Sequence, residues 1–337
     1  MKKSLKSLIA ATATMVSSAA FASNLENPLY MPKNREVYLK TGAGVMYKTV
    51  ERTNATALKE IDGNVEFPVW RFTGDIGYGI TDRLDVHGHF GYTKDGDIDR
   101  KGMHRGRIGL MYRVLEDSDP LVLDLYADAY LSGITPMKGT VKPYGSKFAF
   151  DFDNYSNGRW GAIVGTRFGK TWDKFTLGSH VEYLQTFGNH NNKIAIDPTL
   201  PWSALFPDEI AVDLKSTHET TAGFDAMYQA NDKWSFGAGF EYIEHMDNGV
   251  KSIHTKLPNK GTPPMTTAAV AKQLLAATKN MKDGWDEYVI KTSASYQYTD
   301  DVQFTVFFEY TLDDAHSNSQ NATDVKAELG VRLNARF

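Results

Sequence analysis

Two histidines, two positions apart, are the residues whose types and spacing come closest to known site chemistry. His87 and His89 fall in a run that alternates apolar and polar residues, so both imidazoles point to the same side as Asp85, and Asp75 lies in the run before them. Such imidazoles can bind a metal ion, or act with a carboxylate as an acid–base pair. No third ligand follows at a useful spacing, however, and no serine nucleophile motif accompanies them. We therefore expect no metal site, no cofactor and no catalytic residue.

Charged residues of opposite sign recur on successive segments. Arg105, Arg107 and Arg113 precede Asp124 and Asp128 along the chain. If the two segments form a hairpin, Arg113 lies near Asp124 and Arg107 lies near Asp128, as direct or diagonal cross-strand pairs. What such pairs can do depends on the elements that carry them.

The C-terminal segment shows most clearly what those elements are. In "DVKAELGVRLNARF", apolar residues occupy every second position from Val325 to Phe337, with polar residues or glycine between them. A period of two over this length indicates a β-strand. At about 13 residues, the strand is roughly twice the usual length in soluble proteins and close to what crosses a bilayer at a tilt.

Eleven further segments carry the same alternation, which gives twelve strands. Five short turns, four of them with a shared Asp-centred sequence, alternate with long polar connections. Short turns at one end and long loops at the other are typical of an outer-membrane β-barrel. The expected fold is all-β: a transmembrane antiparallel β-barrel of about twelve strands over residues 35–337, with short periplasmic turns and long extracellular loops. The turns are expected near 80–82, 115–119, 170–173, 230–232 and 299–301, and the loops at roughly 50–66, 94–103, 133–157, 189–215, 247–285 and 313–323.

The first residues have the features of an export signal. Three lysines and an apolar run end in Ala20-Phe21-Ala22, the small-x-small pattern of a secretory signal peptide, so we expect residues 1–22 to be removed. Residues 23–34 would then form a short periplasmic N-terminal segment. The chain has 41 acidic residues against 37 Lys and Arg, three of them in this leader, so the exported protein is acidic and we expect no binding of nucleic acid.

With its leader, its alternating strands and the terminal "GVRLNARF", the chain resembles the bacterial outer-membrane β-barrel proteins, without matching one porin family. The resemblance implies a place in the outer membrane of a Gram-negative bacterium, with outer-membrane lipid against the apolar faces. It also implies that Phe337 is an assembly signal read by the barrel-assembly machinery.

If the apolar residues face lipid, the residues between them face the lumen. Rows of Arg opposite rows of Asp and Glu would set up a field across a water-filled path and select solutes by charge. We therefore expect a porin-like, non-enzymatic channel for passive passage of small solutes, whose identity stays open. The side chains expected to line the pore are Arg71, Asp75, Asp85, His87, His89, Arg105, Arg107, Arg113, Asp124, Asp128, Arg167, Glu182, Asp225, Glu241, Lys291, Glu309 and Arg332.

Three alternatives remain open. The first is uptake of a hydrophobic compound, with Trp202, Phe206 and a helix over 267–281 lining a pocket. In the second, paired charges plug the lumen, and the barrel is a surface-binding or structural protein. The third is a barrel hydrolase, which requires a His–Asp pair at the extracellular rim beside a nucleophile or a water site.

Overall fold

The computed structural model describes residues 24–53, 69–95, 101–116, 118–131, 139–141, 150–152, 160–187, 192–196, 209–214, 216–246, 250–256, 285–315 and 321–337. The expected signal peptide, the helix expected over 267–281 and the loop residues Trp202 and Phe206 lie outside this part of the chain. Among the described residues, no helix combines the length and the apolar character needed to cross a membrane.

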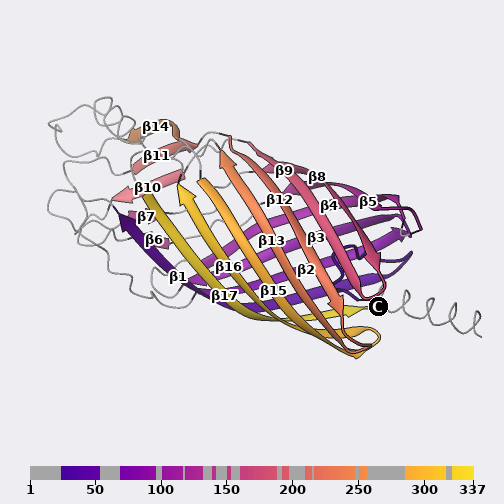
Figure 1. Ribbon diagram of the computed structural model, residues 1–337. Coiled ribbons are helices and arrows are strands. Elements are labelled where there is room, and N and C mark those ends of the chain that lie inside the picture. The colour runs from indigo at the N-terminus through magenta and orange to yellow at the C-terminus, as the bar shows by residue number, and fades with distance from the viewer. Residues whose placement is uncertain are drawn as a thin grey trace, which may run out of the picture.

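Twelve antiparallel strands close into a barrel, as the alternation predicted (Figure 1). Neighbours along the chain are neighbours in the barrel, and the first strand pairs with the last to complete the ring. The strands, in order around the barrel from the first, are β1 (Val37–Thr53), β17 (Asn321–Arg336), β16 (Val302–Ala315), β15 (Trp285–Thr299), β13 (Trp234–Met246), β12 (His218–Gln229), β9 (Phe175–Thr186), β8 (Gly161–Trp172), β5 (Val122–Tyr130), β4 (Lys101–Leu115), β3 (Leu84–Asp95) and β2 (Val69–Thr81).

The two faces of each strand differ as a membrane barrel requires. On β4 and β5, Ile108, Leu110 and Leu125 lie on the outside, each about half exposed, whereas Asp124 on the inside is fully buried. Large apolar side chains are exposed in the same way on the outside of the other strands, including Trp70, Trp160, Trp234, Phe304 and Leu329. This apolar exterior gives lipid a continuous surface.

The Asp-centred sequences form the short turns, which all lie at one end of the barrel (Figure 1). In "KTWDKFTL", Asp173 adopts a left-handed backbone conformation with φ of 43°, which Asp tolerates better than most residues. In "GITDRLDV", the Asp82 carboxylate accepts a hydrogen bond from the Asn34 backbone N–H at 2.9 Å. One turn therefore also holds the chain that leads into β1.

A second, five-stranded sheet occupies three of the connections that were expected to be loops. It lies at the end of the barrel opposite the short turns (Figure 1). Its strands pair antiparallel in the order β14 (Val250–Lys256), β11 (Glu209–Leu214), β10 (Asn192–Ile196), β7 (Phe150–Phe152) and β6 (Gly139–Val141). The expected long polar loops 133–157, 189–215 and 247–285 are thus joined by main-chain pairing.

The N-terminal segment lies inside the barrel at the short-turn end. Leu25 and Leu29 are buried, with exposed fractions of 1% and 3%, and Tyr30 and Met31 are buried beside them. Residues 24–32, which we call the N-terminal plug, contact lumen side chains on opposite walls of the barrel. Residues 23–34 were expected to form a short periplasmic segment; the described part of that segment is instead largely inserted into the lumen.

The C-terminal Phe337 completes the closure of the ring. Its backbone N–H donates to the Val37 carbonyl at 2.8 Å, and its own carbonyl accepts from the Val37 N–H at 3.0 Å, while its side chain is 78% exposed. The phenyl group of Phe337 therefore does not pack inside the barrel, and its role as an assembly signal remains a prediction.

We expect Phe337→Ala to lower the amount of folded protein in the outer membrane several-fold, whereas Phe337→Tyr should assemble nearly normally. Equal surface amounts of Phe337→Ala and the unmodified protein would argue against a terminal assembly signal.

Candidate functional site in the barrel lumen

A cavity of about 850 Å³ occupies the lumen next to the plug, and all twelve barrel strands contribute residues to its lining. Twelve of the seventeen side chains that were expected to face inward line this cavity. They are Arg71, Asp75, His87, His89, Arg107, Asp128, Arg167, Glu182, Asp225, Glu241, Lys291 and Glu309. Four others, Asp85, Arg113, Asp124 and Arg332, do not line it, and the side chain of Arg105 lies outside the described part of the chain.

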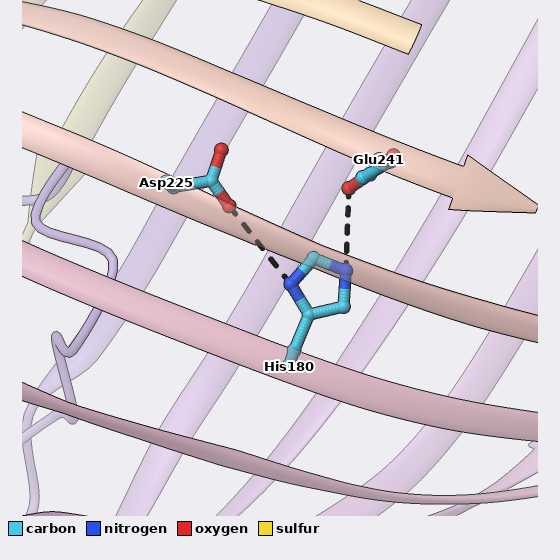
Figure 2. A group of neighbouring side chains, drawn as sticks. All are labelled: His180, Asp225 and Glu241. Carbon is cyan, nitrogen blue, oxygen red and sulfur yellow. Dashed lines mark ion pairs between the residues drawn. The ribbon is translucent and has the colours of Figure 1, made fainter. Parts of the chain in front are cut away.

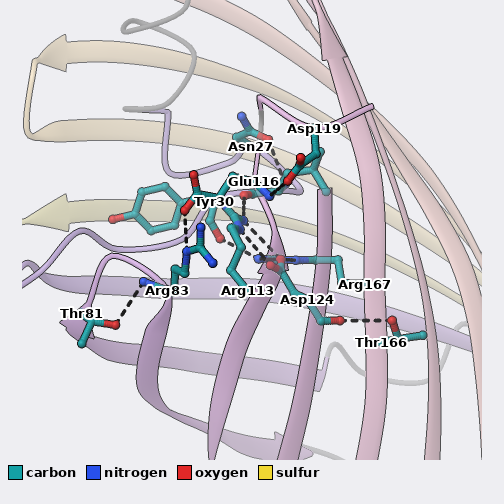
Figure 3. Close-up of polar contacts among 11 residues, drawn as sticks. Asn27, Tyr30, Thr81, Arg83, Arg113, Glu116, Asp119, Asp124, Thr166 and Arg167 are labelled. Atoms are coloured by element: carbon teal, nitrogen blue, oxygen red, sulfur yellow. Dashed lines mark hydrogen bonds and ion pairs between the residues drawn. The ribbon is translucent and has the colours of Figure 1, made fainter. Parts of the chain in front are cut away.

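Asp124 joins the barrel wall to the plug (Figure 3). Its carboxylate is fully buried and accepts hydrogen bonds from Arg113 Nε at 2.8 Å and from Arg167 Nη2 at 2.6 Å. The same two guanidinium groups donate to the plug: Arg113 Nη2 to the Leu29 carbonyl at 2.6 Å, and Arg167 Nη2 to the Tyr30 carbonyl at 3.0 Å. The predicted hairpin pairing of Arg113 with Asp124 is present, and one buried carboxylate orients both arginines toward the plug.

The opposite wall holds the plug through side chains. The Glu26 carboxylate accepts from Arg332 Nη1 at 3.0 Å and from Asn334 Nδ2 at 2.7 Å. Asn24 accepts from Gln303 Nε2 at 2.8 Å and donates to Ser235 Oγ at 3.1 Å. Together with the arginines of β4 and β8, these contacts pin the plug from both sides of the barrel.

The charges around Glu26 determine whether its carboxyl group is ionised. Burial alone would raise the pKa of Glu26, but the positive charges of Arg332 and Lys40 and the hydrogen bond from Asn334 lower the pKa below its usual value of 4.5. Glu26 is therefore ionised at neutral pH. Tyr30, the aromatic residue of the plug, has a pKa far above its usual value, because it is buried and donates its hydroxyl hydrogen to Glu36.

Above the plug, pairs form between strands that are not adjacent. Arg107 on β4 bonds Glu182 on β9 at 3.0 Å and lies 3.7 Å from Asp128, the diagonal partner predicted from the hairpin. Arg71 on β2 bonds Glu328 on β17 at 2.8 Å, across β1. Gly44 of β1 makes room for that pair, because a Cβ there would lie 2.4 Å from a Glu328 carboxylate oxygen.

His87 and His89 do not form a shared site. His87 lies between two buried carboxylates, with Nδ1 3.0 Å from Asp85 and Nε2 3.1 Å from Asp128, whereas His89 Nδ1 lies 2.6 Å from Asp75. His87 is three residues from the start of β3, about 10 Å from the short turns by strand rise, and so is far from the rim that a hydrolase would use. Each histidine therefore has its own carboxylate partners, and the two imidazoles do not converge on one point.

One group of side chains has metal-ligand types within reach of one another. Ligand atoms of His180, Asp225 and Glu241 all lie within 4.8 Å among the described residues (Figure 2). However, the two carboxylates approach opposite ring nitrogens, with Nδ1 4.0 Å from Asp225 and Nε2 3.4 Å from Glu241. Lys291 also forms an ion pair with Glu241. The arrangement suits a histidine held between carboxylates better than a metal ion, which would have to displace the Lys291 ammonium group.

Alternation alone does not reveal which inward residues are apolar. Ile163, Leu184, Ile243 and Val289 line the cavity and are buried, although they occupy inward positions where polar residues were expected. In the sequence they stand out only as apolar residues out of phase with their strands. The cavity wall therefore combines an apolar area with the charged pairs.

The carboxylate–histidine cluster near the loop end was likewise not foreseen. His245, next to the last residue of β13, has Nδ1 2.9 Å from Glu219 and Nε2 3.6 Å from Glu287. Glu287 also lies 3.6 Å from Lys326. β12 and β13 form a hairpin in which Glu219 pairs in register with His245, and Glu287 lies on β15, the next strand of the barrel. The register of that hairpin is the signal that could have revealed the Glu219–His245 pair.

Comparison with known proteins places the fold. No protein-family model matches the sequence, and no curated protein matches it. The crystal structure of an outer-membrane channel from Pseudomonas putida F1 resembles the chain with a TM-score of 0.53 at 11% identity, covering 93% of this chain and 99% of that one. The fold is thus that of a bacterial outer-membrane channel barrel.

Two further solved structures show weaker likeness. The toluene transporter TodX of P. putida has a TM-score of 0.43 at 12% identity, with 93% of each chain covered. The translocator domain of the autotransporter NalP from Neisseria meningitidis has a TM-score of 0.44 at 12% identity, covering 100% of this chain and 98% of that one. At these scores, neither likeness adds to the assignment. The chain is an outer-membrane β-barrel with the fold of a channel protein.

Proposed function

We propose that the protein is an outer-membrane uptake channel for small organic compounds that carry apolar surface. The main support for the proposal is the lumen cavity, which has room for a small solute, is partly lined by apolar side chains, and is bounded by the plug at the short-turn end. A pocket that combines an apolar wall with a few polar groups is the usual form of a small-molecule site. This favours the hydrophobic-uptake alternative over a general porin.

The plug is the second reason to prefer an uptake channel. A general porin needs a continuous water-filled path, but buried plug residues such as Leu25, Leu29 and Met31 occupy the short-turn end of the lumen. A solute would enter the cavity from the loop end, rest there, and leave when the plug shifts. The charged pairs of the cavity wall would then orient the polar part of the solute.

Charge-selected diffusion of polar solutes is the second candidate. It is favoured by the density of ion pairs along the wall, such as Arg107 with Glu182 and Arg71 with Glu328. This candidate predicts that solutes pass according to their size and charge alone. The first candidate predicts that, at equal size and charge, a solute with more apolar surface passes faster or blocks the current.

Planar-bilayer recording of the purified, refolded protein under a salt gradient tests the proposal. We expect discrete conductance steps, with brief interruptions when a small aromatic alcohol such as benzyl alcohol is added, and fewer interruptions with glycerol. Ile243→Ser, which removes an apolar side chain of the cavity wall, should weaken the effect of benzyl alcohol. Steps that respond equally to both solutes would favour the diffusion candidate, and complete silence would favour a surface-binding or structural barrel.

A further inference from the structure

The charges that line the cavity do not balance. Among the described residues, nine carboxylates line it, but only five Arg or Lys side chains and three histidines do. The carboxylates are those of Asp75, Asp128, Glu182, Glu219, Asp225, Glu241, Glu287, Glu309 and Glu328, and the basic side chains are those of Arg71, Arg107, Arg167, Lys291 and Lys326. Among the described residues that line the cavity, the carboxylates therefore outnumber the basic side chains even if every histidine is charged.

Each of the five basic side chains is already paired with a carboxylate. The contacts are Arg71–Glu328 at 2.8 Å, Arg107–Glu182 at 3.0 Å, Arg167–Asp124 at 2.6 Å, Lys326–Glu287 at 3.6 Å, and Lys291–Glu241. Among the described residues, no Arg or Lys side chain of the cavity wall is thus left over to attract an anion. The ion-pair partners of Asp75, Asp128 and Asp225 include histidines, and Glu309 shares Arg71 with Glu328.

Asp225 is the most open of these carboxylates. Its side chain is 37% exposed, more than the 25% of Glu309 or the 33% of Asp75. Its one ion-pair contact among the described residues is the long approach to His180 (Figure 2). Glycines flank it in register on both neighbouring strands: Gly178 on β9 and Gly239 on β13.

Those glycines keep the carboxylate accessible. A Cβ at Gly239 would lie 2.2 Å from Asp225 Oδ1, so a larger residue there would push the carboxylate aside. Gly178 also lines the cavity. At the positions paired with Asp225, neither neighbouring strand therefore has a side chain that could cover the carboxylate.

The same cavity offers surfaces that suit an organic body. Tyr38, Tyr126 and Tyr130 line it. The apolar residues named above also line it: Ile163, Leu184, Ile243 and Val289. Aromatic rings attract ammonium groups through their π faces, and apolar side chains bind the carbon skeleton. A strongly hydrated inorganic cation gains nothing from either surface.

We propose that the channel selects small organic cations, meaning an ammonium group on an apolar body, and that Asp225 is the residue that determines this preference. The inference rests on the proposed uptake function and names the class of its solute. The carboxylate excess repels anions, Asp225 receives the ammonium group, and the tyrosines and apolar residues receive the rest.

The test uses the full-length protein in planar bilayers. Reversal potentials are measured in a potassium chloride gradient, then with benzyltrimethylammonium in place of potassium, and separately with benzenesulfonate in place of chloride. Both organic ions keep their charge at all relevant pH values and have similar size. We expect cation preference, current carried by benzyltrimethylammonium, and little current carried by benzenesulfonate.

The variant Asp225→Asn should lower the cation-to-anion permeability ratio at least about twofold, because one exposed lumen charge is lost. The matched control is Asp232→Asn, which makes the same change of charge in an exposed short turn. Anion preference, or a ratio that Asp225→Asn leaves unchanged, would overturn the inference and leave the channel function intact. Absence of any current in the unmodified protein would count against both.

Discussion

Replacing Asp124 by Asn is expected to remove a large part of the stability of the folded barrel. The change removes the one charge that neutralises both Arg113 and Arg167, whose side chains are only 11% and 19% exposed. Breaking a buried ion pair by removing one partner costs about 3–5 kcal/mol, a large part of a total stability of about 5–15 kcal/mol. The urea concentration at the midpoint of unfolding should be clearly lower than in the unmodified protein. The loss of the heat-modifiable band on gels measures this midpoint.

Two further variants separate charge from shape. Asp300→Asn changes the same group in an exposed turn and should leave the unfolding midpoint unchanged. Asp124→Asn combined with Arg167→Gln removes one of the two uncompensated charges and should recover part of the lost stability. If Asp124→Asn alone unfolds like the unmodified protein, the carbonyls of Leu29 and Tyr30 would be sufficient partners for the arginines, and the central place of Asp124 in this network would be wrong.

Deleting the plug, residues 24–32, is expected to produce the largest change in conduction. The short-turn end of the lumen would lose buried side chains such as Leu25 and Leu29, together with every hydrogen bond that crosses from β8 to β17 through the plug. Because a twelve-stranded ring is wide enough to leave a path once it is emptied, the mean current should rise on the order of tenfold. Single-channel recording of both proteins at the same salt concentration measures the effect.

A milder variant guards against a barrel weakened by the deletion. Glu26→Gln keeps the plug but removes its ion pair with Arg332, so openings should become more frequent at unchanged step size.

The pH dependence of the current follows from the same carboxyl group. The pKa of Glu26 is lower in the folded protein than the usual 4.5, so its contribution is complete above that pH and is lost as the pH falls through the lower folded value. Acid should open the unmodified channel more than it opens Glu26→Gln. Unchanged current after plug deletion would show that the closure lies elsewhere.

Much of the barrel could be predicted from the chain, because alternation is a local property. Each strand records in its own residues which side meets lipid, and a tight turn fixes the register of its two strands. The pairing of Arg113 with Asp124 followed from that register alone. Register within a hairpin therefore predicts contacts between its two strands, but not contacts with other strands.

What could not be predicted depends on contacts across the lumen. Arg107 meets Glu182 past the two intervening strands β5 and β8, and Arg71 meets Glu328 past β1. Both contacts require a lumen narrow enough for side chains to reach that far. The plug has no periodicity to reveal it: "NLENPLYMP" is a short segment with two prolines, and its burial is due to the barrel around it. The outer five-stranded sheet consists of strands of three to seven residues, too short for a recognisable pattern.

The covalent link between plug and barrel determines how the plug competes for its site. Only Lys33–Glu36 separate the plug from β1, so a displaced plug stays within a few residues of its binding position. Such a short tether corresponds to an effective concentration on the order of millimolar, whatever the abundance of the protein. Reclosure is then a unimolecular step whose rate does not depend on any partner in the periplasm. A competitor arriving from solution would have to match that local concentration, so under the proposed function each channel would be closed again by its own chain.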